Sequence, residues 1–190
     1  RPIFLIIPML IFIPYMKRAF PLYSPVKLEQ MALDQGFRHR WEDGKEHLIE
    51  QDYADMLGWR ELAIKVDSVY ATLSDKAGLV VFCDNYGQAG AINYYKKNKA
   101  YQAMSFNADY INWYRSRPVQ TMIRIKGYDD DPTRLHNEHV LFKQVQLAGQ
   151  IENKYAREYK TEIYILAEPK ADIQKFLDSE RKELLKPDGL

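Results

Sequence analysis

A turn between a buried strand and a helix carries most of the residues that could do chemistry. Residues 78–83 form the apolar run Gly-Leu-Val-Val-Phe-Cys, which predicts a strand buried on both faces. The turn that follows, residues 84–90, reads Asp-Asn-Tyr-Gly-Gln-Ala-Gly. Ligands of open α/β sheets bind where strands end and helices begin. We therefore expect any binding site of this chain to include this turn.

The turn partly matches the dinucleotide fingerprint Gly-x-Gly-x-x-Gly. Gly87 and Gly90 stand at its second and third glycines, and Asn85 replaces the first. Gly87 would let a ligand approach the backbone, and the amides of the new helix would hold an anion. The alternative is that Asn85 takes a left-handed turn, which Asn tolerates, while the glycines serve close packing. Because the first glycine is missing, we favour packing and expect no cofactor.

The remaining reactive side chains do not form a recognisable catalytic or metal set. Asp84 has no second carboxylate at a matching spacing nearby. His136 and His139 follow the acidic run 129–131, but zinc sites need three or four converging ligands. Cys83 lies in the buried strand, where a thiol is inert. We assign no catalytic residue and no metal ligand.

Aromatic residues gather after the second predicted strand. Tyr110, Trp113 and Tyr114 lie on the side of the sheet where a ligand would bind. Aromatic rings stack on sugar faces, so a carbohydrate-contacting surface is one interpretation. The other is partial burial of amphipathic rings at a domain or membrane interface.

The elements that must position these residues alternate along the chain. Apolar residues three and four apart predict a helix over 52–73, and a short helix is predicted over 26–35 after Ser24-Pro25. Further helices are predicted over 87–97, 109–114, from Asp131-Pro132 onward, and 171–185, with strands over 78–83, 101–106, 118–125, 142–151 and 162–166. This order predicts an α/β fold with a doubly wound, mostly parallel Rossmann-like sheet and an antiparallel edge.

The two ends of the chain differ, and three parts are expected. Residues 1–20 form the end of a transmembrane segment or an apolar arm, 21–51 a connector with an exposed polar loop, and 52–190 the α/β domain. The apolar run 2–14 is shorter than the ~20 residues that span a bilayer, and prolines interrupt it. Tyr15, Lys17 and Arg18 follow it, as aromatic and basic anchors do at a membrane interface.

Composition excludes some function classes. The 190 residues carry a net charge of +1 without a basic stripe, so no nucleic-acid partner is expected. The single cysteine excludes an internal disulfide framework but leaves the compartment open.

Four segments together resemble one enzyme family. They are Arg-Trp-Glu-Asp-Gly-Lys at 40–45, the Tyr-Ala-Asp-Met-Leu-Gly-Trp stretch within 51–59, residues 83–92 around the turn, and Glu-Asn-Lys-Tyr-Ala at 152–156. In order and spacing they are similar to the C-terminal region of bacterial glycosyltransferases of family 39, relatives of protein O-mannosyltransferases and the aminoarabinose transferase of lipid A. The resemblance covers roughly residues 14–168.

The resemblance implies a fragment of a polytopic membrane enzyme. The parent would move a sugar from a polyprenyl phosphate to a protein, lipid or glycan acceptor outside the cytoplasm. Its catalytic acids would lie in a loop between early transmembrane helices, outside this chain. This domain would then be non-catalytic, on the extracytoplasmic (periplasmic) side of the inner or plasma membrane, and partnered by the transmembrane portion of its own protein.

Two positions depart from the family's pattern. Many relatives have Glu where Gln88 stands, and many have a Ser-Gly-His-Asn segment where this chain reads Ser-Phe-Asn at 105–107. Six residues at the expected switch point are proposed to contact the acceptor or its glycan: Asn85, Tyr86, Gly87, Gln88, Asn107 and Trp113. Two alternatives remain open, a stand-alone Rossmann-like nucleotide- or sugar-binding module and a structural brace for the membrane portion.

Overall fold

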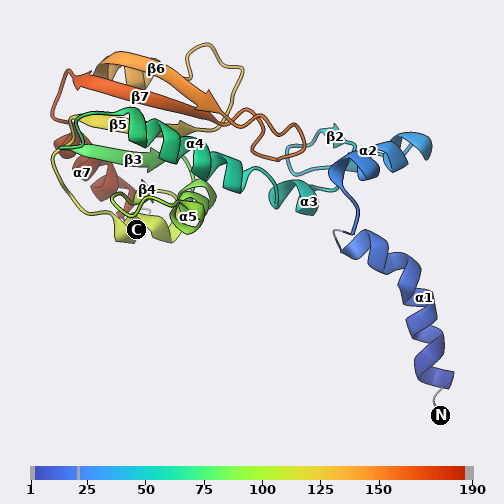
Figure 1. Cartoon of the computed structure of the whole chain (residues 1–190). Coiled ribbons are helices and arrows are strands. Elements are labelled where there is room, and N and C mark those ends of the chain that lie inside the picture. Colours follow the sequence, from blue (N-terminus) through green and yellow to red (C-terminus); the bar gives the residue numbers. More distant parts are fainter. Residues whose placement is uncertain (1–2, 21, 187–190) are drawn as a thin grey trace. The chain divides into compact units, whose positions relative to one another are not determined.

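The computed structural model describes residues 3–20 and 22–186, which divide into two compact units. Unit 1 consists of residues up to Leu57 together with Tyr155–Arg157, and unit 2 of Gly58–Lys154 and the chain from Glu158 onward. Figure 1 shows the elements along the chain.

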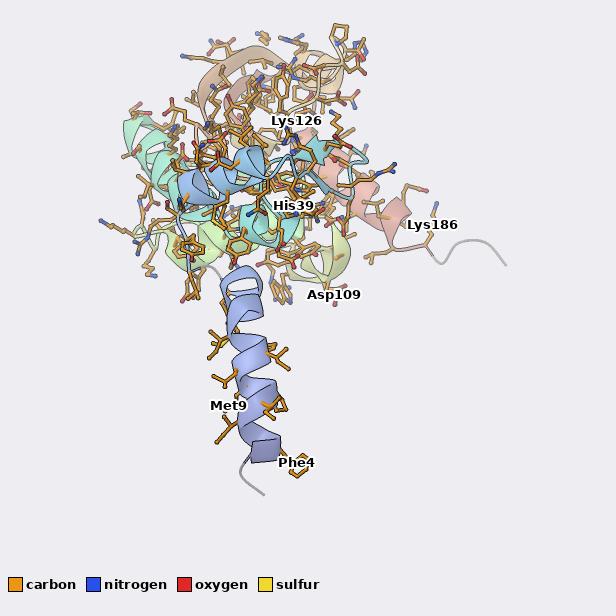
Figure 2. All side chains as sticks on the ribbon, turned by 90° about the vertical axis from the view of Figure 1, so that its right-hand side faces the viewer. Phe4, Met9, His39, Asp109, Lys126 and Lys186 are labelled. Carbon is orange, nitrogen blue, oxygen red and sulfur yellow. The ribbon has the colours of Figure 1, made fainter. Side chains whose placement is uncertain are left out.

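Unit 1 begins with an apolar helix. Helix α1 (Ile3–Ala19) continues past Pro8 and Pro14, where the sequence had predicted interruptions. Apolar side chains project from it on several sides, as Figure 2 shows for Phe4 and Met9, and Phe4 is 82% exposed. The side chains of Tyr15, Lys17 and Arg18 lie outside the described part. Within residues 3–20 and 22–186, no helix has both the length and the apolar character needed to cross a membrane.

The rest of unit 1 is a short helix, a hairpin and one further helical turn. Helix α2 (Pro25–Asp34) starts where predicted, because Ser24 accepts a hydrogen bond from the amide of Lys27 and a proline fits the first helical position. Strands β1 (His39–Arg40) and β2 (Glu46–His47) pair antiparallel, so the prediction of a loop here was wrong. The rings of Trp41 and His47 stack with centroids 3.5 Å apart, which adds packing that no strand periodicity reveals.

A distant segment completes unit 1. The amide of Arg157 donates to the carbonyl of Ala54, just inside helix α3 (Gln51–Asp55), and its guanidinium pairs with Asp55 at 3.3 Å and Glu42 at 3.0 Å. The hydroxyl of Tyr155 donates to Glu29 at 2.5 Å. Residues from the far side of the sequence therefore contribute to this small unit.

Unit 2 starts after a glycine break. The sequence predicted one helix over 52–73, but Gly58 has φ +84° and separates α3 from α4 (Trp59–Thr72). A left-handed residue ends one helix because it turns the chain out of the helical path. The break brings Trp59 to the first position of α4.

A mixed five-stranded sheet forms the centre of unit 2. Its strand order is β4-β3-β5-β7-β6, with β3 parallel to β4 and β5, and β7 antiparallel to β5 and β6. The strands are β3 (Leu79–Cys83), β4 (Ala103–Ser105), β5 (Thr121–Lys126), β6 (Phe142–Gln150) and β7 (Glu162–Pro169). The fold is therefore a mixed α/β fold with a partly parallel sheet, and the hairpin of unit 1 adds a separate two-stranded sheet.

Helices cover the sheet as the strand alternation requires. Val80 and Phe82 face a core cluster that includes Ile173 and Leu177 of α7 (Ile173–Leu184). Because side chains alternate along a strand, Val81 points to the opposite face, where α4 and α5 (Tyr86–Tyr95) pack. Figure 1 shows α4 in front of the sheet and the fainter α7 behind it.

Two connections complete the unit. The 3-10 helix η1 (Ala108–Trp113) follows β4, as the predicted helical turn did. Helix α6 (His136–Leu141) begins later than the predicted start at Asp131-Pro132. Asp131 instead accepts hydrogen bonds from the amide and the hydroxyl of Thr133, which forms a turn before the helix.

Candidate functional site

The start of α5 is fixed by two reciprocal side-chain caps. Oδ1 of Asn85 accepts from the amide of Gln88 at 2.9 Å, and Oε1 of Gln88 accepts from the amide of Asn85 at 3.4 Å. Together they form a capping box, which satisfies amides that a helix start leaves free. Asn85 has φ −132°, so it caps the helix from an extended conformation and not from the left-handed turn that was considered.

The fully buried Gln88 joins this cap to a distant loop. Its Nε2 donates to Oε2 of Glu158 at 2.8 Å, and its Oε1 also accepts from the amide of Asp84. Glu158 in turn accepts from the hydroxyl of Thr161. All the polar atoms of the Gln88 side chain are thereby engaged, so Gln88 positions the site and is closed to a ligand.

A second predicted residue holds the neighbouring loop against the helix start. Oδ1 of Asn107 accepts from the amide of Tyr86 at 3.4 Å, and the amide of Asn107 donates to the hydroxyl of Ser105. The amides of residues 85, 86 and 88 therefore all donate to side-chain oxygens of the chain itself. Because these backbone amides are already hydrogen-bonded, the start of α5 has few free N–H groups with which to hold a phosphate.

The glycines of α5 allow large side chains to approach the helix closely. A Cβ built on Gly87 would lie 3.4 Å from the Trp59 ring and 3.1 Å from Oδ1 of Asn85. A Cβ on Gly90 would lie 3.1 Å from the hydroxyl of Tyr110. Neither glycine has a positive φ, so close approach and not turn geometry favours glycine here.

An open groove runs along this glycine face. The residues that line it are Trp59, Gly87, Gly90, Ala91, Tyr94 and Tyr95. Tyr94 is 79% exposed, and Tyr86 and Trp113 are each 57% exposed. The Trp113 ring lies 4.6 Å from that of Tyr110. We call the residues Trp59, Tyr86, Gly87, Gly90, Ala91, Tyr94, Tyr95, Tyr110 and Trp113 the aromatic groove.

The structure thus sorts the six predicted contact residues into two groups. Gly87 lines the groove, and the Tyr86 and Trp113 side chains are exposed. Asn85, Gln88 and Asn107 maintain the backbone beneath it. Sequence reasoning missed Tyr94 and Tyr95, although Gly87, Gly90, Ala91 and Tyr94 follow the three-and-four spacing of one helix face.

Comparison with known proteins assigns the chain to no family. No protein-family model matches the chain, and no curated protein or solved structure matches it either.

Other reactive side chains near the switch point have structural partners. Asp84 pairs with Arg124 and accepts from the amide of Gly127 at 2.8 Å, so it ties the ends of β3 and β5 together. Burial raises the pKa of the Cys83 thiol, which keeps it protonated and unreactive. In the part of the chain that the structure describes, no three His, Cys, Asp or Glu side chains converge as a metal site requires.

Three of the four segments with the family resemblance contribute residues to unit 2, namely Trp59, the turn with Gly87, and Glu152–Asn153. Trp59 packs on Gly87, and Glu61 accepts from the amides of Glu152 and Asn153 at 2.7 and 3.3 Å. These contacts join α4, α5 and the loop after β6. These residues therefore form part of the framework around the aromatic groove.

Proposed function

We propose that this chain is an accessory extracytoplasmic domain of a polytopic membrane glycosyltransferase of the family-39 type, and that its aromatic groove contacts the glycan of the acceptor. The observation that carries the proposal is the set of exposed rings around a glycine floor on α5. Sugar rings present flat C–H faces that stack on such side chains, while hydroxyl groups remain available to polar groups. The guanidinium of Arg60, 5.9 Å from the Tyr95 ring centroid, supplies polar donors at the rim.

Helix α1 supports attachment of the domain to a membrane. Its exposed side chains include Phe4, Met9, Leu10, Ile11 and Phe12, and a helix that is apolar all round is typical of burial in protein or lipid. Transfer of each such side chain from water to an apolar phase yields about 1.5–3 kcal/mol. We propose that α1 belongs to a membrane segment of the parent enzyme. That enzyme would take its sugar from a polyprenyl-phosphate donor.

The alternative of a nucleotide-binding module has less support from the geometry. The strand order β4-β3-β5 is compatible with a doubly wound sheet, because β4 is added on one side of β3 and the next strand in sequence, β5, on its other side. The ligand position of such a sheet, at the ends of β3 and β5, is taken by the Asp84–Arg124 pair. We therefore favour a Rossmann-like framework that has lost the nucleotide site.

Glycan titration of the whole chain in detergent micelles tests the proposal. We expect mannose oligosaccharides to shift the indole signals of Trp59 and Trp113 in NMR spectra, in a saturable way. The variants Trp113→Ala and Tyr94→Ala should weaken binding about three- to tenfold each, because an aromatic contact contributes about 0.5–1.5 kcal/mol. The matched control is Tyr159→Ala, which removes another exposed ring of unit 2.

Two results would contradict the proposal. One is the absence of saturable shifts with any glycan, which would favour the brace. The other is a tight response to nucleotides, which would favour the binding module.

A further inference from the structure

A separate pocket lies on the opposite face of the sheet from the aromatic groove. It occupies about 130 Å³ between β5, α6 and α7. Its walls are mostly apolar: Phe82, Met122, Leu141, Leu166, Phe176 and Leu177. A cavity of about 150 Å³ holds a benzene-sized molecule. This pocket therefore suits a ligand of about five or six heavy atoms.

The polar end of the pocket contains a buried carboxylate that is only half satisfied. Glu138 is 6% exposed, and its Oε1 receives the ammonium of Lys126 at 3.1 Å and lies 3.6 Å from Nε of Arg124. Its Oε2 is buried and has no hydrogen-bond partner among the described residues. A buried acceptor without a donor costs about 1–3 kcal/mol. The open lone pairs of Oε2 thus favour a ligand that brings a donor.

The neighbouring charges favour a donor with a positive charge. Both cations are already engaged, since Arg124 also pairs with Asp84 and donates to the carbonyl of Ile125. Glu180 of α7 lines the same pocket. Asp84, Glu138 and Glu180 stand against Arg124 and Lys126, three carboxylates to two cations. One additional cation would balance the cluster.

We propose that this pocket binds a small primary amine, with its ammonium group on Oε2 of Glu138 and its short hydrocarbon body between the apolar walls. The ammonium supplies three donors, of which one would reach Glu138 and a second the carboxyl group of Glu180. The volume restricts the body to about four to six carbons. This site is independent of the glycan surface, so either proposal can fail without the other.

Titration of the whole chain in detergent with n-butylamine and n-pentylamine tests the site. We expect saturable binding with a Kd of about 1 mM, because five or six heavy atoms contribute at most a few kcal/mol. The neutral analogues n-butanol and n-pentanol should bind at least about tenfold more weakly, since they lack the charge. Sodium butyrate should not bind.

Two variants locate the amine. Glu138→Gln keeps the shape of the side chain but removes its charge, and should weaken n-butylamine binding at least about tenfold. Because the loss of this buried charge leaves Lys126 and Arg124 without their partner and risks unfolding, Glu180→Gln is the second variant. We expect about a threefold loss from it. The matched control on the same helix, Glu183→Gln, should leave binding unchanged, since Glu183 pairs with Lys186 on the surface.

Several outcomes would overturn the proposal. One is the lack of saturable binding of either amine up to about 50 mM, which would leave water as the occupant of the pocket. Another is equal affinity for amine and alcohol. The third is that Glu180→Gln and Glu183→Gln weaken amine binding equally.

Discussion

The buried contact between Gln88 and Glu158 allows a sharp test with one atom changed. In Gln88→Glu, an oxygen would replace Nε2 at 2.8 Å from Oε2 of Glu158. Two charges at that distance repel by about 6 kcal/mol at an effective dielectric constant near 20. Binding one proton at pH 7 costs only about 3.7 kcal/mol for a carboxyl group with a pKa of about 4.3 in the unfolded chain. The folded variant should therefore take up a proton instead of holding two charges.

The cost of binding this proton sets both the size and the sign of the change in stability. We expect Gln88→Glu to lower the free energy of unfolding by about 3–4 kcal/mol at pH 7. The pKa of the carboxyl pair is raised in the folded state, so the folded chain binds more protons than the unfolded chain. Relative to the unchanged protein, stability should then fall by about 1.4 kcal/mol for each pH unit between 4.5 and 7, and the deficit should be under about 1 kcal/mol at pH 4.5.

Urea denaturation followed by circular dichroism, at several pH values, measures this effect. The matched control is the exchange Gln88→Glu with Glu158→Gln, which restores one amide and one carboxylate with their places reversed. We expect the double variant to lie within about 1 kcal/mol of the unchanged protein, with a coupling energy of about 2–3 kcal/mol between the sites. A single variant that loses under about 1 kcal/mol at pH 7, with no pH slope, would refute the buried contact.

Two further predictions concern reactivity and backbone geometry. Cys83 should resist a thiol reagent at pH 8 in the folded chain and react fully in denaturant, because burial raises the pKa of its thiol; rapid labelling of the folded chain would contradict this. Gly78→Ala should lower the free energy of unfolding by about 2–3 kcal/mol, measured by urea denaturation, because Gly78 has φ +66° and its new Cβ would lie 3.0 Å from the amide nitrogen of Gln120. Gly149→Ala is the control: its Cβ would make only an ordinary 3.7 Å contact, so a cost equal to that of Gly78→Ala would exclude strain as the cause.

Local patterns predicted most elements of unit 2. The apolar run 78–83 marks β3 because a strand covered on both faces needs apolar side chains at every position. Residues 142–151 predicted β6, which spans Phe142–Gln150. The helix break at Gly58 escaped prediction, because an apolar spacing of three and four continues across it and a single glycine does not reveal its φ angle.

The sites depended on contacts that sequence order does not reveal. The turn after β3 was placed correctly at the end of a strand, but the burial of Gln88 follows from Glu158, 70 residues away. The pocket proposed to bind an amine was even less predictable, since its charged residues Lys126, Glu138 and Glu180 come from β5, α6 and α7. The packing of α7 and of the segment around α6 against the sheet brings these charges together.

The contribution of Tyr155–Arg157 to unit 1 has a consequence for synthesis of the chain. The ribosome makes the rest of unit 1 by Leu57, about 100 residues before the three residues that complete it. At about 5–20 residues per second, the N-terminal unit waits roughly 5–20 s with Glu29, Glu42 and Asp55 lacking the partners that those residues supply. Unit 1 thus leaves the ribosome before unit 2 but cannot be finished before β6 of unit 2 has been synthesised. Nascent chains stalled before residue 155 should therefore show this region as more sensitive to protease than the released chain.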